Sequence, residues 1–76
     1  MSKFFYTYVL RSLADKKFYV GWTVDLRSRL QEHNGGNVES TKTRRPLVLV
    51  YYEACLNREK AIKRENIEDW FWKKVP

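Results

Sequence analysis

The sequence has one cysteine, one histidine and no long uninterrupted apolar segment. A single cysteine excludes an intrachain disulfide framework and leaves too few thiolates for a cysteine-based zinc site. A single histidine excludes a histidine-rich metal cluster. The longest apolar run, Leu47 to Tyr52, is far shorter than the roughly 20 residues that cross a bilayer. Arg11 directly follows the apolar N-terminal run without an evident small-residue cleavage site, so we expect a cytoplasmic protein with a reduced thiol.

Apolar and basic residues are abundant in the 76-residue chain. Hydrophobic residues make up 43% and aromatic residues 16%, which is not the composition of a disordered protein. This length has room for one small domain, spanning residues 1–76. The 15 Lys and Arg against 9 Asp and Glu give a formal net charge of +6, which favours an anionic partner such as nucleic acid. A basic balance also serves solubility, so charge alone leaves the function open.

Local patterns predict an α+β domain with elements in the order β-β-α-β-α. Apolar, β-prone residues at 4–10 and 18–21 predict a hairpin of two strands. A helix is expected at 25–34, with Asp25 near its start and Asn34-Gly35-Gly36 at its end. The continuous apolar run at 47–52 predicts a strand buried on both faces. A second helix is expected from Arg58 to about Asp69.

Two charged residues are expected to point toward the sheet. Leu26, Leu30 and His33 fall at i, i+4 and i+7 on one stripe of the first helix, and Arg29 shares that stripe. Glu65 interrupts the apolar stripe of the second helix in the same way. Burying a charge is costly unless it is paired or used, so Arg29 and Glu65 are either a buried ion pair or part of a site.

The polar residues expected on the inner faces suit the hydrolysis of a phosphodiester bond. No Ser–His–Asp or Cys–His arrangement is evident in the sequence. A carboxylate can hold Mg²⁺ with few other protein ligands, because the ion keeps several waters. A metal and an arginine stabilise charge on the phosphate, and a tyrosine or histidine can accept a proton from water. The candidates are Tyr8 (or Tyr6), Tyr19, Arg29, His33 and Glu65.

These residues lie in motifs that resemble the GIY-YIG nuclease superfamily, and most closely its small stand-alone bacterial members, which are similar to the nuclease domain of the excision-repair incision subunit. The resemblance runs from about Phe4 to Glu65. Each motif alone is weak, but their order and spacing together are specific. The matching segments are Tyr6-Thr7-Tyr8-Val9-Leu10, Tyr19-Val20-Gly21, the helix carrying Arg29 and His33, the segment from Ser40 to Ala54, and Ala61-Ile62-Lys63-Arg64-Glu65.

The resemblance implies a three-stranded antiparallel sheet flanked by helices and a metal-dependent DNA endonuclease. One Mg²⁺ or Mn²⁺ ion would be bound by Glu65. Tyr8 and Tyr19 would lie near the scissile phosphate, one of them as general base, and Arg29 would bind that phosphate. His33 would be an auxiliary base or a positioning group. The implied products of strand cleavage have 3′-hydroxyl and 5′-phosphate ends.

Further residues are expected to contact the nucleic acid. Gly21 would allow close approach of the backbone, and basic residues would contact phosphates. The protein is expected to be a monomer that binds DNA and no membrane, with a partner protein as a possible source of substrate specificity. The predicted nucleic-acid-binding residues are Gly21, Arg27, Lys42, Arg44, Arg45 and Lys63.

Two departures from the family pattern keep other functions open. Tyr6-Thr7 stands in place of the Gly-Ile of the first motif. After Glu65 the segment Asn66-Ile67-Glu68-Asp69-Trp70 replaces the longer lysine-rich stretch of similar proteins. One alternative is therefore a non-catalytic nucleic-acid-binding module that keeps the fold. Another is a protein-interaction domain anchored by Trp70, Phe71 and Trp72.

Overall fold

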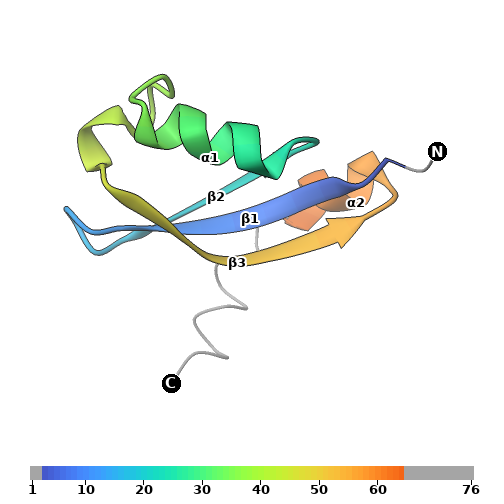
Figure 1. Ribbon diagram of the computed structural model, residues 1–76. Coiled ribbons are helices and arrows are strands. Elements are labelled where there is room, and N and C mark those ends of the chain that lie inside the picture. Colours follow the sequence, from blue (N-terminus) through green and yellow to red (C-terminus); the bar gives the residue numbers. More distant parts are fainter. Residues whose placement is uncertain (1–2, 65–76) are drawn as a thin grey trace.

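The computed structural model of the chain describes residues 3–64 and shows an α+β fold. In this range the elements follow the predicted order (Figure 1). None of these helices is long and apolar enough to cross a membrane. The expected continuation of the second helix to about residue 69 lies outside the described residues. The elements are β1 (Phe5–Ser12), β2 (Phe18–Thr23), α1 (Leu26–Asn34), a 3-10 helix (Lys42–Arg44), β3 (Leu47–Cys55) and α2 (Arg58–Lys63).

The three strands form an antiparallel sheet in the order β2-β1-β3, so β1 is the central strand. Tyr8 of β1 lies opposite Gly21 of β2 and opposite Tyr52 of β3. The stretch from Thr7 to Leu10 is fully buried, as expected for a strand with neighbours on both sides. The polar side chains of Thr7 and Tyr8 in this stretch therefore lie in the interior of the protein.

The expectation that residues 47–52 form a strand buried on both faces is wrong. β3 lies at an edge of the sheet, and its residues alternate between less and more exposed positions. Val48, Val50 and Tyr52 are 43%, 40% and 52% exposed. The continuous apolar run did not distinguish an edge strand from a central one, because its pattern carries no information on strand order. The irregular register between Val9 and Leu10 of β1 also shifts the pairing with this strand.

The two helices contact opposite faces of the sheet. Tyr8 reaches His33 of α1, whereas the hydroxyl of its neighbour Thr7 donates to the carbonyl of Ala61 in α2 at 2.8 Å. Successive strand residues point to opposite faces, which places the helices on opposite sides. Figure 1 shows α1 lying across the sheet. The core on the α1 face consists of Tyr8, Leu10 and Leu47, with Tyr19, Leu26, Leu30 and Leu49 packed against them.

Both ends of α1 are fixed by local contacts that the sequence indicates. The Asp25 carboxylate accepts a hydrogen bond from the backbone N–H of Ser28 at 3.1 Å, which caps the helix. Gly36 follows the helix with φ of +79°, a conformation that side-chain-bearing residues rarely adopt. Asn34 then joins the helix to β3, because its amide both donates to and accepts from the backbone of Leu47. These contacts set the position of α1 over the sheet.

Buried hydroxyl groups hold the connection between α1 and β3 against the β1–β2 loop. Ser12 is fully buried, and its hydroxyl donates to the carbonyl of Arg44 at 2.6 Å while accepting from the N–H groups of Ala14 and Asp15. Thr41, in the same connection, is also fully buried. The sequence predicts a polar, basic loop here, and the structure shows that this loop also contributes to the interior.

Candidate active site

Three side chains form a hydrogen-bonded row that links β1, α1 and the segment before β3. The hydroxyl of Tyr8 lies 2.9 Å from Nε2 of His33, and Nδ1 of the same ring lies 2.7 Å from the hydroxyl of Thr41. None of the three is more than 1% exposed. The imidazole of His33 is therefore held at both nitrogens, in a place that solvent does not reach.

The second predicted tyrosine lies against the same imidazole. The ring of Tyr19 is 5.2 Å from the ring of His33, centroid to centroid, and Tyr8 is 5.7 Å from it, both in edge-on arrangements. Tyr19 lies opposite Leu10 in the β1–β2 register, so it occupies the same sheet face as Tyr8. The structure thus brings three of the predicted catalytic residues together around one ring.

Gly21 has no side chain at a point where the Tyr8 ring passes directly over its backbone. A Cβ atom at this position would lie 2.6 Å from Cζ of Tyr8, well inside van der Waals contact. Gly21 is therefore needed for the packing of Tyr8, whatever its role toward DNA. Its conformational freedom does not matter here, because only the missing Cβ makes room for the phenol.

Arg29 projects from α1 one turn before His33 and pairs with Glu32. The guanidinium and the carboxylate are 3.0 Å apart, and the Arg29 side chain is 35% exposed. Glu32 lies three residues after Arg29 on the same helix, and this i, i+3 spacing lets the two side chains meet. The sequence also suggested a buried ion pair between Arg29 and Glu65, but Glu65 lies outside the described residues.

Burial and charge act on Tyr8 in opposite directions. Desolvation raises the pKa of the Tyr8 phenol above its ordinary value, because the phenolate is poorly solvated there. The Arg29 guanidinium beside the hydroxyl opposes this rise through hydrogen bonding and its positive charge. The proximity of Tyr8 in turn raises the pKa of Arg29, which stays charged. Arg29 is thus the group that makes a Tyr8 phenolate less unfavourable.

His33 is neutral near pH 7 in this environment. Burial lowers the pKa of the imidazole, and the positive charge of Arg29 lowers it further. The carboxylate of Glu32 acts in the opposite direction but with a smaller effect. A neutral imidazole has one N–H donor and one acceptor nitrogen, so its two contacts have defined directions.

A pocket of about 430 Å³ opens over the edge strand β2, next to these residues. Both tyrosines, Gly21 and Arg29 line it, so four of the predicted functional residues face one space. At its rim the guanidinium of Arg58 lies 5.2 Å from the ring centre of Trp22. The pocket is open to the free edge of the sheet, where an extended polymer can approach.

The predicted metal ligand, Glu65, lies outside the described residues. Within residues 3–64 no three His, Cys, Asp or Glu side chains gather in a way that could hold a metal ion. The carboxylate of Glu32 is engaged by Arg29, and that of Asp25 caps α1. The donors around the pocket are thus phenols, an imidazole and a guanidinium, so the metal assignment depends on Glu65 alone.

The predicted nucleic-acid-binding cations differ in how far they are engaged within the protein. Arg44 donates from Nε to the carboxylate of Asp15 at 2.7 Å and from its terminal nitrogen to a β2 carbonyl, so it ties two loops together. Lys42 pairs with an exposed Glu39 at 3.3 Å. Arg45 donates to a backbone carbonyl and has no acidic partner within residues 3–64. Exposed positions on α1 and α2 carry Arg27 and Lys63.

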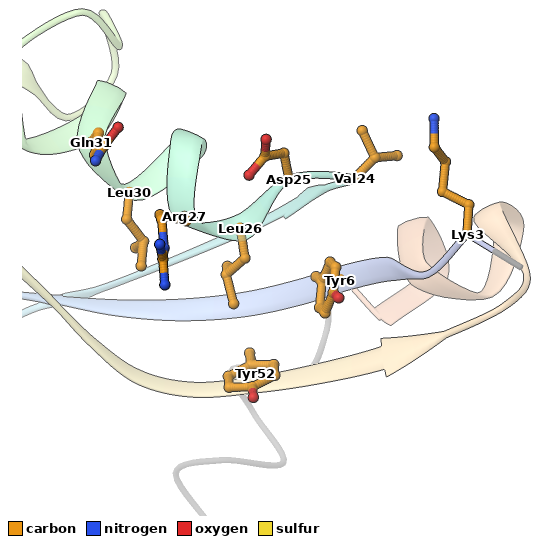
Figure 2. A pocket seen from close by; sticks show the side chains of 9 residues that line it. All are labelled: Lys3, Tyr6, Val24, Asp25, Leu26, Arg27, Leu30, Gln31 and Tyr52. Atoms are coloured by element: carbon orange, nitrogen blue, oxygen red, sulfur yellow. The ribbon is translucent and has the colours of Figure 1, made fainter. Parts of the chain in front are cut away.

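A second hollow, of about 750 Å³, lies between α1 and the other edge of the sheet. Figure 2 shows Leu26 and Leu30 pointing from the helix toward Tyr6 and Tyr52 on the strands, with Arg27 beside them. The rings of the two tyrosines are 6.0 Å apart. This apolar groove is separate from the pocket over β2, and Arg27 is the predicted nucleic-acid-binding residue on its rim.

Thr41 and Glu32 contact the predicted site residues but were not found by sequence reasoning. Thr41 lies eight residues after His33 in an irregular segment, so no helical or strand periodicity connects the two. Its position within the Ser40–Pro46 motif was the only available signal. The i, i+3 spacing from Arg29 was a usable signal for Glu32.

A family model described as the GIY-YIG catalytic domain matches residues 4–73. The chain belongs to the GIY-YIG family. This places it in a nuclease superfamily whose members act on nucleic acids and generally depend on a metal ion. The match also continues past Glu65, so the departure expected there does not end the likeness to the family.

GIY-YIG relatives include several UPF0213 proteins. One from Syntrophus aciditrophicus is 45% identical over 62 residues, covering 79% of this chain and 70% of the relative. One from Pediococcus pentosaceus is 44% identical over 62 residues, covering 80% of this chain and 64% of the relative. The solution NMR structure of the UPF0213 protein BH0048 from Bacillus halodurans is 29% identical in sequence, with a TM-score of 0.51. The match covers 88% of this chain and 71% of that protein. These likenesses support the fold, and their names state no activity.

Proposed function

We propose that this GIY-YIG protein is a metal-dependent endonuclease that hydrolyses phosphodiester bonds in DNA. The observation that carries the proposal is the convergence of Tyr8, Tyr19 and Arg29 on one pocket over the edge strand β2, with the buried His33 in contact with both tyrosines. A phosphate in this pocket would meet a guanidinium and two phenols. Such a set can neutralise a phosphate and handle a proton, which is what hydrolysis requires.

The proposed reaction is the attack of a water oxygen on the phosphorus atom. A P–O bond to the water forms, the bond to the 3′ oxygen breaks, and the products carry 3′-hydroxyl and 5′-phosphate ends. A tyrosine oxygen takes a proton from the water, and the departing 3′ oxygen gains one. Arg29 neutralises charge on the phosphate while this occurs. A Mg²⁺ or Mn²⁺ ion held by Glu65 would supply further stabilisation of the phosphate charge.

The pKa effects at the site explain why Arg29 has two tasks. An ordinary tyrosine is almost entirely protonated near pH 7, and burial makes the Tyr8 phenolate still less favourable. The positive charge of Arg29 counteracts this effect and also attracts the phosphate. The ion pair with Glu32 holds the Arg29 guanidinium at the pocket. The Glu32 carboxylate also offsets part of the positive charge that Arg29 presents to a phosphate. Neutral His33 completes the site as an auxiliary base or a positioning group.

We propose that exposed cations guide the DNA strand to this pocket. Arg27, Arg45 and Lys63 have no acidic partner within residues 3–64, so their charges are available for phosphates. Lys42 is shared with exposed Glu39, an interaction that a phosphate can replace. Arg44 is engaged between two loops, and its proposed DNA contact stays a prediction.

The test is a cleavage assay on end-labelled single-stranded, duplex and branched DNA with Mg²⁺ or Mn²⁺. We expect cleavage that stops in EDTA and in the Glu65→Gln and Tyr8→Phe variants. Glu68→Gln is the matched control for a nearby acidic residue and should cleave normally. Circular dichroism should confirm that every variant is folded. Full activity in EDTA and in Glu65→Gln would refute the metal assignment.

A negative cleavage result also has a defined meaning. If the folded chain binds DNA with a steep dependence on salt but cuts no substrate, the endonuclease proposal is wrong and the non-catalytic binding module is favoured. Size-exclusion chromatography in the same buffer tests the expected monomer. The choice of substrate among the three DNA forms would give the first information on specificity.

A further inference from the structure

We propose that Thr41 is a positioning residue whose hydroxyl donates to Nδ1 of His33, so that the ring proton is kept on Nε2 and donated to Tyr8. This fixes the direction of both hydrogen bonds in the buried row. It also decides between the two roles left for His33, because a ring that already donates from Nε2 does not accept the Tyr8 proton. The consequence for cleavage rests on the proposed endonuclease function, whereas the tautomer itself does not.

The hydroxyl of Thr41 lies in the interior of the protein. Its side chain is fully buried, and Nδ1 of His33, at 2.7 Å, is its one hydrogen-bond partner among the described residues. The backbone of Thr41 is fixed by hydrogen bonds to the carbonyl of Val38 and from the N–H of Arg44. A hydroxyl has one proton and two lone pairs, and a buried proton without an acceptor costs more than an idle lone pair. Thr41 therefore satisfies its proton only by donating to Nδ1.

The hydroxyl of Tyr8 forms the other end of the hydrogen-bonded row. If Nδ1 carried the ring proton instead, Tyr8 would donate to Nε2 and the Thr41 proton would be buried without an acceptor. In the proposed arrangement the Tyr8 oxygen accepts from Nε2–H of His33, so the Tyr8 proton needs a different acceptor. The Tyr8 side chain lines the pocket over β2, where its proton can meet water or a phosphate oxygen. Thr41 and Nε2–H of His33 then both have acceptors within the row, and the Tyr8 proton faces the pocket, whereas the opposite tautomer leaves the Thr41 proton without an acceptor.

The proposed tautomer changes what surrounds the Tyr8 oxygen. Nε2–H of His33 points at it from α1, and the guanidinium of Arg29, from the same helix, acts on it through hydrogen bonding and positive charge. Both groups stabilise a phenolate, so Tyr8 is favoured over Tyr19 as the general base. Tyr19 contacts the imidazole only through its ring edge. The charged group that opposes this effect is Glu32, whose negative charge raises the pKa of Tyr8.

Nitrogen NMR of the native chain tests the tautomer directly. His33 is the only histidine in the sequence, so long-range ¹H–¹⁵N correlation spectra contain one set of imidazole signals. At a pH where the ring is neutral, we expect a protonated Nε2 and an unprotonated Nδ1. A native chain with its proton on Nδ1 would overturn the proposal. This measurement needs neither DNA nor activity, so it separates the present inference from the proposed function.

Two variants test the part played by Thr41. Thr41→Val keeps the shape but removes the hydroxyl, so the ¹⁵N shift of Nδ1 should move to that of a nitrogen without a hydrogen bond. Thr41→Ser keeps the hydroxyl and should retain the native shift. An unmoved Nδ1 signal in folded Thr41→Val would contradict the proposed hydrogen bond. If Thr41→Val does not fold, the native and Thr41→Ser spectra still decide the tautomer.

Cleavage kinetics test the consequence for the site. Loss of the hydrogen bond that orients His33 should lower kcat in Thr41→Val about tenfold, with KM unchanged, and Thr41→Ser should restore it. Equal kcat in native and folded Thr41→Val would show that Thr41 does not position the catalytic group. If no form of the protein cleaves DNA while the Nε2–H tautomer is observed, the proposed function fails and the hydrogen-bond direction stands.

Discussion

Replacing Gly21 with alanine should destabilise the protein, because the new methyl group would meet the Tyr8 ring. The added Cβ would lie 2.6 Å from Cζ of Tyr8. The ring has little room to withdraw, since its hydroxyl contacts His33 at 2.9 Å and the residue is 1% exposed. Relief of the overlap therefore requires the loss of this hydrogen bond or a shift of the paired strands.

The size of the effect follows from three contributions. Overpacking of a buried site costs about 1–3 kcal/mol. Loss of the hydrogen bond between Tyr8 and His33 adds about 0.5–1.5 kcal/mol. The reduced freedom of the unfolded chain with alanine at position 21 offsets about 0.4–1 kcal/mol. The middle of these ranges gives a net loss of about 2 kcal/mol, a large share of the roughly 4–11 kcal/mol typical for 76 residues.

Urea unfolding followed by tryptophan fluorescence measures this loss. Gly35→Ala is the matched control, because Gly35 has φ of −82° in the ordinary helical region, and its expected cost is below about 1 kcal/mol. In a Tyr8→Leu background, which lacks Cζ and the hydroxyl, Gly21→Ala should cost about 1–2 kcal/mol less. A Gly21→Ala change below about 0.5 kcal/mol, or no coupling to Tyr8, would refute the steric explanation.

Three other predictions concern charge. Burial lowers the pKa of His33, so the unfolded chain binds the proton more readily. Stability should therefore fall as the pH drops through the ordinary histidine pKa of about 6.5, and His33→Gln should remove most of this dependence in urea unfolding. Arg44 holds the pKa of the Asp15 carboxyl at about 2, so this ion pair stabilises the fold at a pH above the pKa of Asp15 in the unfolded chain. The stabilisation is lost as the pH falls toward 2, and acid unfolding of Asp15→Asn should lack this pH-dependent loss. Arg27→Gln should reduce the slope of log affinity against log salt by about 0.9, and an unchanged slope in this variant would contradict the proposed phosphate contact.

The sequence determined the elements and most of the candidate site. Periodicity placed His33 and Arg29 on the inner stripe of α1, and Asp25 and Gly36 marked where that helix begins and where the chain leaves it. These signals are local, because the helical repeat and the terminal caps depend on neighbours within a few residues. The family motifs added Tyr8 and Tyr19, whose proximity no local pattern shows.

Tertiary structure alone decided which strand is central and what holds His33. The apolar run at 47–52 reads as a buried strand, but β3 lies at the sheet edge because β1 pairs on both sides. Thr41 reaches Nδ1 of His33 from an irregular segment, and Gly21 lies under Tyr8 through strand pairing. Such contacts join residues far apart in the chain. They depend on how the elements pack against one another, whereas local sequence patterns indicate only the type and extent of each element.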